Sequence, residues 1–108
     1  MSCFKNQLTT LDVSNNTALT YLNCDDNQLT TLDVSKNTAL TKLFCSSNKL
    51  SVLDVSKNTA LTSLCCSYMS TLITLYMASG QVIDYINGTG DKARNNNYIP
   101  ETTTITVK

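Results

Sequence analysis

Apolar residues recur along the chain in short stretches such as Leu-x-Cys and Leu-Asp-Val, with polar turns rich in Asn, Ser and Thr between them. Side chains that alternate with a period of two are typical of β-strands that bury one side. No stretch between two polar turns is long enough for an independent α-helix. Thr and Val favour strands, whereas Asn and Ser favour turns. The pattern therefore predicts an all-β fold built from short strands.

A 21-residue repeat organises these stretches. Residues 19–39 (LTYLNCDDNQLTTLDVSKNTA) and 40–60 (LTKLFCSSNKLSVLDVSKNTA) are identical at 14 of 21 positions. Residues 1–18 match the last 18 positions of the unit, and residues 61–77 are a degraded copy in which Leu75 comes one place late. Both halves of a unit share one skeleton, so each unit is expected to hold two short strands, each followed by an Asn-centred turn.

The units are expected to stack, because one unit alone cannot bury its own leucines. Successive units would lie about 4.8 Å apart, which is the spacing of hydrogen-bonded strands. This predicts a right-handed β-solenoid over residues 1–77, with two short parallel strands in each coil. The coils are residues 1–18, 19–39, 40–60 and 61–77. Residues 78–108 lack the repeat and are expected to form a C-terminal β cap.

The string L-x-x-L-x-C-x-x-N-x-L, found in Leu19–Leu29 and Leu40–Leu50, resembles the leucine-rich repeat. The 21-residue length and the second L-x-x-L-D-V half are similar to the nested bacterial class called IRREKO repeats. The resemblance covers roughly residues 1–77 and departs from the family at the third Leu, which is Cys here. It implies a bacterial secreted or surface protein whose first-strand face binds a partner. It also implies that the first Asn of each unit is buried and bonds backbone groups of its own and the next coil.

Cysteine recurs at one inward-facing position. The column consists of Cys3, Cys24, Cys45 and Cys66. We expect free thiols that act as small hydrophobic side chains, because stacked neighbours lie too far apart for a relaxed disulfide. The period also matches no zinc-ligand spacing. Cys65 points outward and is interpreted either as an incidental surface thiol or as a contact for an intermolecular disulfide in an oxidising medium.

Polar residues form three further ladders with the same period. One Asn ladder is Asn6, Asn27 and Asn48, the other is Asn16, Asn37 and Asn58, and the Asp column is Asp12, Asp33 and Asp54. We expect the Asn side chains to satisfy buried backbone groups in turns, since an amide both donates and accepts. Each Asp is expected to accept hydrogen bonds from the turn that follows it. A calcium site along the Asp column remains an alternative.

The two complete units differ at seven positions, and all seven lie within residues 21–31 and their counterparts 42–52. The scaffold therefore imposes no particular residue there. Aromatic side chains, a Lys and amides on one rigid strand face suit protein recognition. The candidate binding residues are Tyr21, Asn23, Asp25, Lys42, Phe44, Ser46, Ser63 and Cys65, with Tyr21 and Phe44 as anchors. The alternative is a solvated face with stray aromatic residues.

The ends of the chain depart from the repeat. Met1 stands where the second Leu of a unit belongs, which suggests an artificial start with repeats upstream, or an edge covered by another copy. Residues 81–86 (QVIDYI) and 102–107 (TTTITV) alternate like strands, and residues 87–91 are rich in turn formers. The tail is expected to pair with the last coil or to fold over it.

Composition narrows the function classes. The 8 Lys and Arg residues balance the 8 Asp and Glu residues, which argues against nucleic acid or an anionic membrane as the main ligand. The chain has no His, which excludes a His-based triad and a His-ligated zinc site. We find no nucleophile–base pair, and therefore expect no catalysis, no cofactor and no metal. The apolar runs are too short to cross a membrane.

These observations favour a non-catalytic protein-binding module of a bacterial secreted or surface protein, with an unidentified protein partner. Two alternatives stay open. Tyr21 and Phe44 could stack on sugar rings in a carbohydrate-adhesion surface. The chain could also be a structural segment without a ligand that self-associates, forming a homo-oligomer through its uncapped N-terminal edge.

Overall fold

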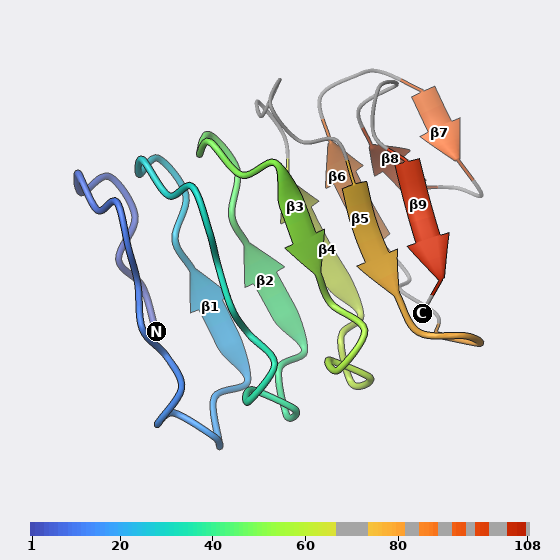
Figure 1. The fold of residues 1–108 in the computed structure, drawn as a ribbon, viewed down its shortest axis with the longest axis horizontal. Coiled ribbons are helices and arrows are strands. Elements are labelled where there is room, and N and C mark those ends of the chain that lie inside the picture. The colour runs from blue at the N-terminus through green and yellow to red at the C-terminus, as the bar shows by residue number, and fades with distance from the viewer. Residues whose placement is uncertain (67–73, 82–84, 89–91, 95–96, 100–103, 108) are drawn as a thin grey trace.

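The computed structural model describes residues 1–66, 74–81, 85–88, 92–94, 97–99 and 104–107. Within these ranges the chain forms short strands and no helix, so no helix there could cross a membrane. The strands are β1 (Tyr21–Asn23), β2 (Lys42–Phe44), β3 (Val52–Asp54), β4 (Ser63–Cys66), β5 (Thr74–Met77), β6 (Tyr85–Gly88), β7 (Lys92–Arg94), β8 (Asn97–Ile99) and β9 (Thr104–Val107). Figure 1 shows two facing layers along which the repeat units follow one another. The predicted all-β fold is confirmed for the described residues.

The first layer is a four-stranded parallel sheet in the order β1-β2-β4-β6. Its strands are in register one repeat apart, so that Tyr21 lies beside Lys42 and Lys42 lies beside Ser63. Ser63 lies beside Tyr85, one residue further along than the repeat predicts. The first strand of each unit from residue 19 onward is therefore where the pattern predicts it, and the sheet continues beyond residue 77.

The second layer is a three-stranded parallel sheet in the order β3-β5-β9. Leu53 lies beside Leu75, and Leu75 lies beside Ile105. Leu75 is fully buried although it comes one place late in the sequence, because its whole strand has shifted with it. Strands β7 and β8 pair antiparallel in a separate two-stranded sheet.

Apolar side chains between the two layers form one core. The largest fully buried side chains are Leu22, Leu29, Leu40, Leu43, Leu50, Leu53, Leu61, Leu64 and Leu75. Each buried Leu contributes about 1.5–3 kcal/mol to stability, so this core is the main stabilising feature. Cys3, Leu8 and Leu11 of the first unit are only partly buried and pack against this core.

The prediction of two strands in every unit is wrong for the second half of the first two units. Residues 10–12 and 31–33 form no strand, whereas their counterparts in β3 and β5 do. A strand requires a neighbour at hydrogen-bonding distance. The second sheet begins at β3, and a groove lies between residues 30–33 and 51–54. Strand pairing between units therefore begins at β1 in the first layer but only at β3 in the second layer.

The tail adds one strand to each layer. The strands expected at residues 81–86 and 102–107 are found in part, as β6 and β9. The expected turn is wrong at Asn87 and Gly88, which belong to β6 because they pair with Cys65 and Cys66. The remainder of that turn lies outside the described residues. The capping role of the tail and the boundary at residue 78 stay predictions.

The first Asn ladder ties each unit to its neighbour. Asn48 donates from Nδ2 to the carbonyl oxygens of Cys24 in the preceding unit and Cys45 in its own, each at 3.0 Å. Its Oδ1 accepts the N–H of Leu29 at 3.1 Å. Asn27 repeats this set one unit earlier. Asn27 and Asn48 have the expected buried structural role, although the neighbour that they reach is the preceding unit and not the next one. Asn6 does not have this role, because it is exposed and bonds only the carbonyl of Cys3 in its own unit.

The second Asn ladder works in the same direction. Asn58 donates to the carbonyl oxygens of Val34 and Asn37, both at 2.9 Å. Asn37 repeats this pair of bonds one unit earlier. Gln81 extends the ladder, since it donates to the carbonyl oxygens of Val55 at 2.9 Å and Asn58 at 2.8 Å. Sequence analysis missed Gln81 because it is not an Asn and lies outside the 21-residue period.

Candidate recognition face

The outer face of β1, β2 and β4 carries two columns of side chains. Strand register places Tyr21, Lys42 and Ser63 in one column and Asn23, Phe44 and Cys65 in the other. Between the columns, the intervening Leu of each strand faces the core and is fully buried. The alternation of the strands therefore displays the predicted residues on a backbone that the ladder hydrogen bonds hold rigid.

Tyr21 and Phe44 form an aromatic pair on this face. Their ring centroids lie 5.6 Å apart, with an angle of 60° between the ring planes. The pair is diagonal across two strands, because Tyr21 lies beside Lys42 and Phe44 lies two residues further along β2. The edge-to-face arrangement fixes both rings, and such pairs contribute about 0.5–1.5 kcal/mol beyond area burial. Tyr21 is 37% exposed, so one ring stays available at the surface.

Lys42 is exposed beside this aromatic pair. It stands between Tyr21 and Ser63 in its column, and Ser63 is half-buried. A cation next to two fixed rings offers an apolar contact and a charged contact within one patch. This combination is typical of the residues that dominate protein interfaces.

Three of the predicted binding residues, Asn23, Asp25 and Ser46, form hydrogen bonds in the turns that follow the strands. Asn23 accepts the N–H of Asp25 on Oδ1 at 3.1 Å, and Asp25 accepts the N–H of Ser46 at 2.6 Å. Burial raises the pKa of the Asp25 carboxyl, and the Ser46 hydrogen bond opposes the rise. Ser46 is only 8% exposed. The expectation that Ser46 is displayed at the surface is therefore corrected, because Ser46 is buried and its backbone bonds Asp25 and Asp26 of the preceding unit.

The thiols on and beneath this face are free cysteines. Half-buried Cys65 has its pKa raised to about 11 by burial, with a further contribution from the charge of Asp25. The ladder thiols of Cys24 and Cys45 donate to the carbonyl oxygens of Phe44 and Cys65 at 3.4 and 3.5 Å. The described part of the chain holds no group of three or more potential metal ligands. The predicted column of buried free thiols is thus present at Cys24, Cys45 and Cys66.

The Asp column lies on the opposite face and is tied to the turns that follow it. Asp12 and Asp33 each accept the backbone N–H of the Ser two residues on, at 2.9 Å. The pKa of both carboxyls is lowered first by hydrogen bonds from the side chains of Ser14 and Ser35 and then by these backbone bonds. Asp54 accepts the N–H of Ser56 in the same way. The predicted structural role is confirmed for all three residues.

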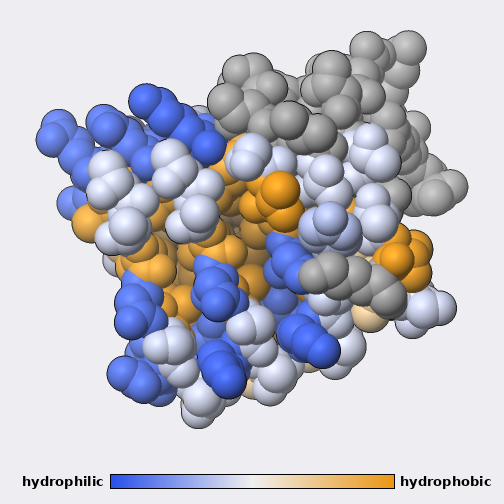
Figure 2. All heavy atoms as spheres, viewed as in Figure 1, coloured by the Kyte–Doolittle hydropathy of each residue, from blue (hydrophilic) through white to orange (hydrophobic). Residues whose placement is uncertain are grey.

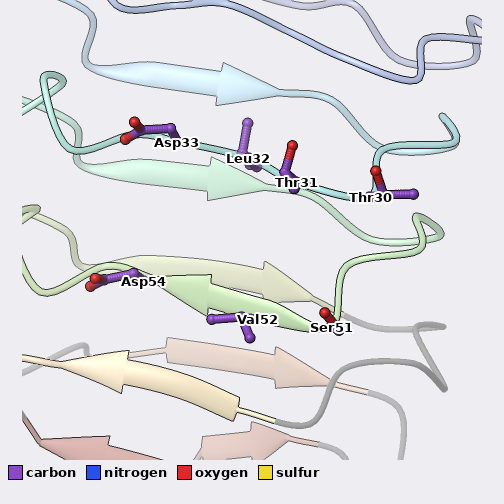
Figure 3. Close-up of a pocket in the computed structure, with 7 residues that line it drawn as sticks. All are labelled: Thr30, Thr31, Leu32, Asp33, Ser51, Val52 and Asp54. Atoms are coloured by element: carbon purple, nitrogen blue, oxygen red, sulfur yellow. The ribbon is translucent and has the colours of Figure 1, made fainter.

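The second layer carries a groove, shown in Figure 3, that was not predicted from the sequence. It is lined by Thr30, Thr31, Leu32, Asp33, Ser51, Val52 and Asp54. One signal was present, because Val52 stands where the preceding units have Thr10 and Thr31. Val52 is 46% exposed, so its apolar character is not explained by the core.

Comparisons with known proteins support a repeat protein. Residues 2–24 match a family described as the LVIVD repeat. The chain is also similar in structure to the functional domain of InlJ from Listeria monocytogenes, which includes a cysteine ladder. The TM-score is 0.55 and the identity 26%, over 94% of this chain and 27% of that chain. This chain therefore spans about a quarter of that structure. None of the curated proteins with which the sequence was compared matches it.

Proposed function

We propose that the chain forms a right-handed leucine-rich-repeat solenoid of the nested bacterial class and that it binds a protein partner through the outer face of β1, β2 and β4. The in-register repeat of this sheet supports the solenoid, as does the similarity to the InlJ domain with its cysteine ladder. We place the whole protein outside the bacterial cell, secreted or on the surface. The repeated L-x-x-L-x-C-x-x-N-x-L string supports that location only through the family it resembles.

The observation that carries the binding proposal is the fixed Tyr21–Phe44 pair with exposed Lys42 beside it. A rigid aromatic pair loses little conformational entropy when a partner covers it. Aromatic anchors of this kind commonly cost about 2 kcal/mol or more of binding energy when truncated. The neighbouring Lys42 adds charge selectivity, so the partner is expected to present an acidic or carbonyl-rich patch.

The proposed module is non-catalytic. Burial raises the pKa of Cys24 and Cys66 to about 12 and of Cys65 to about 11, so these thiols are poor nucleophiles near neutral pH. A carbohydrate ligand is the less favoured alternative. Tyr21 and Phe44 stand 60° apart, so their rings do not form one flat platform for adjoining sugar rings.

The experiment is a pull-down from host and bacterial surface extracts with the wild-type chain and a Tyr21→Ala/Phe44→Ala variant. A second variant, Lys42→Glu, tests the charge. Its matched control is Lys36→Glu, which makes the same charge change at an exposed residue outside this face. We expect a partner that the wild type and Lys36→Glu retain and that the other two variants lose.

Circular dichroism must first show that every variant is folded. A partner retained by the aromatic variant and by Lys42→Glu would contradict the assignment of this face. Binding on a glycan array without any protein partner would favour the carbohydrate alternative instead.

A further inference from the structure

The two layers of strands form two opposite faces of the molecule. Figure 1, viewed down the shortest axis, shows β3, β5 and β9 in front and β1, β2, β4 and β6 behind them. The recognition face, which is the outer face of β1, β2 and β4, therefore lies on the other side from the face that carries β3. One molecule can thus present each face to a different neighbour.

The face that carries β3 holds a groove of about 350 Å³ between this strand and residues 30–33. Hydrogen bonds between neighbouring units close it at both ends. At one end, Lys49 donates its N–H to the carbonyl of Leu29 at 2.8 Å. At the other end, Asn58 donates from Nδ2 to the carbonyl of Val34 at 2.9 Å. The groove is therefore a short depression, which suits a protruding side chain and not an extended strand.

The groove is apolar at its centre and acidic at one end. Val52 lines its centre and is 46% exposed. Figure 3 shows Asp33 and Asp54 toward the same end, and Asp33 is exposed there. Figure 2, which views this face, shows apolar surface at its centre with hydrophilic surface above and below it. The groove therefore suits a ligand that combines an apolar part with a cation.

The recognition face carries the complementary chemistry. Tyr21 and Phe44 form the fixed aromatic pair, and exposed Lys42 stands beside Tyr21 in its column. The ammonium of a Lys is carried on a flexible four-carbon stem, which can itself cover apolar surface. Lys42 can therefore extend into a shallow depression on another molecule while the two rings contact the apolar surface around it.

We propose that the partner of the recognition face is a second copy of this chain, whose groove receives the side chain of Lys42. In this contact the Tyr21–Phe44 pair covers the apolar centre around Val52, and the ammonium of Lys42 lies at the acidic end beside Asp33. The inference rests on the proposed function, because it uses the same face. Since face and groove lie on opposite sides, the contact is head-to-tail, and copies associate into an open series and not a closed dimer.

Two properties of the chain favour a second copy over an unrelated acidic protein. Lys42 and Val52 belong to one repeat unit, residues 40–60, so every molecule that presents the cation also presents the groove. The 8 Lys and Arg residues balance the 8 Asp and Glu residues, so two copies do not repel each other through their net charge.

The first test is sedimentation equilibrium of the purified full chain from about 10 µM to about 1 mM. We expect the average mass to rise with concentration beyond that of a dimer. The face variant Lys42→Glu and the groove variant Thr31→Lys/Asp33→Lys should each weaken association at least about tenfold, because each brings like charges together. Lys5→Glu is the matched control, since exposed Lys5 lies outside both the recognition face and the groove. It should leave association within about twofold of the wild type.

Circular dichroism must first show that each variant is folded. Val52→Lys provides a second groove variant that keeps Asp33 and its bond to Ser35, and it should weaken association in the same way.

An equimolar mixture of the face variant and the groove variant is the decisive test. In the mixture, the acidic face of Lys42→Glu meets the basic groove of Thr31→Lys/Asp33→Lys, and the two unchanged surfaces meet each other. We expect the mixture to associate within about threefold of the wild type, although neither variant does so alone.

Three results would overturn this inference. They are a chain that stays monomeric up to about 1 mM, a mass that stops at a dimer, and a mixture that associates no better than its components. If the chain stays monomeric but the pull-down still captures another protein that Tyr21→Ala/Phe44→Ala loses, the proposed function stands and this inference fails. Association and capture that are both unchanged in Tyr21→Ala/Phe44→Ala and in Lys42→Glu would contradict the two proposals together.

Discussion

The side-chain amide of Gln81 donates to the carbonyl oxygen of Asn58 at 2.8 Å, in the place where the ladder of the preceding units has an Asn. A second bond from the same amide reaches the carbonyl of Val55, and Gln81 Oε1 accepts the N–H of Ala78. One side chain thus satisfies three backbone groups at the turn that follows β5. The longer Gln reaches across the extra residues that separate it from Asn58.

We predict that Gln81→Ala lowers the free energy of unfolding by about 1–3 kcal/mol, because three partly buried backbone groups lose their partner. Gln81→Glu should cost at least as much, since it keeps the length of the side chain but removes the donor. Urea unfolding followed by circular dichroism measures both. Equal stability of Gln81→Ala and the wild type would show that water replaces the amide at no cost.

Asn48 and Asn6 occupy the same position of the repeat but differ in burial and in the hydrogen bonds that they form. Asn48 is 6% exposed and bonds two units, whereas exposed Asn6 bonds only the carbonyl of Cys3 in its own unit. We predict that Asn48→Ala costs about 2–4 kcal/mol and that Asn6→Ala costs about 0.5 kcal/mol or less. Thermal melts of the two variants provide the comparison. Similar losses at both positions would mean that the cost lies in the turn itself and not in the bonds between units.

The repeating part of the fold could be predicted, because the same residue types recur at equivalent positions of several units. The inward Leu and Cys columns, the Asn ladders and the Asp–Ser turns all recur at 21 residues. Their chemistry is local, since the buried backbone carbonyls of a turn need donors, which the Asn amides supply. Even so, the direction of the Asn bonds toward the preceding unit depends on backbone geometry that the pattern does not contain.

The features that the sequence did not predict depend on how units are spaced in three dimensions. Thr31 and Val52 have nearly the same local sequence, yet only Val52 lies in a strand. The difference is whether the next segment in the second layer comes within hydrogen-bonding distance. On the recognition face, exposure of Tyr21 followed from alternation, whereas buried Ser46 is hydrogen-bonded to Asp25 and Asp26 of the preceding unit. Long-range packing of this kind is invisible to periodicity.

Ser47 has a φ of 54°, in the left-handed region that L-residues other than Gly occupy at a cost. The same conformation recurs at Lys5 and Asp26, always one residue before the first Asn of the ladder. We predict that Ser47→Gly raises the free energy of unfolding by about 0.5–1 kcal/mol. Lys49→Gly is the control, and it should lower stability by about the same amount because Lys49 is not in this region. Chemical denaturation decides, and destabilisation by both substitutions would contradict the argument.

The Asp33 carboxyl makes the free energy of unfolding depend on pH in the acidic range. Hydrogen bonds from Ser35 lower the folded-state pKa of its carboxyl below the ordinary 3.8, so the charge contributes stability above that pH. This contribution is lost as the pH falls below 3.8 toward the folded-state pKa. Because the carboxylate is exposed, we expect less than about 1 kcal/mol. Asp33→Asn keeps an acceptor for Ser35 and should reduce the loss of stability between about pH 4 and pH 2. Parallel acid dependences of variant and wild type would show that the charge contributes nothing.

The buried thiols make the free energy of unfolding depend on pH in the basic range, where stability falls as the pH rises. Burial raises the folded-state pKa of Cys24 and Cys66 to about 12 and of Cys65 to about 11, against an ordinary value of 9.0. Above pH 9 the unfolded chain loses thiol protons that the folded chain retains. The free energy of unfolding must therefore fall as the pH rises through 9.

The same shifts predict slow labelling of the native protein. At pH 8 a thiol with a pKa of about 11 is about one part in a thousand thiolate, against about one part in ten for a pKa of 9.0. Native Cys65 should react with iodoacetamide at least about tenfold more slowly than cysteines of the urea-unfolded chain, and Cys24 and Cys66 more slowly still. Mass spectrometry of timed aliquots identifies each site. Rapid native labelling at Cys65 would contradict its half-buried setting and would revive the interpretation of Cys65 as a disulfide contact between molecules.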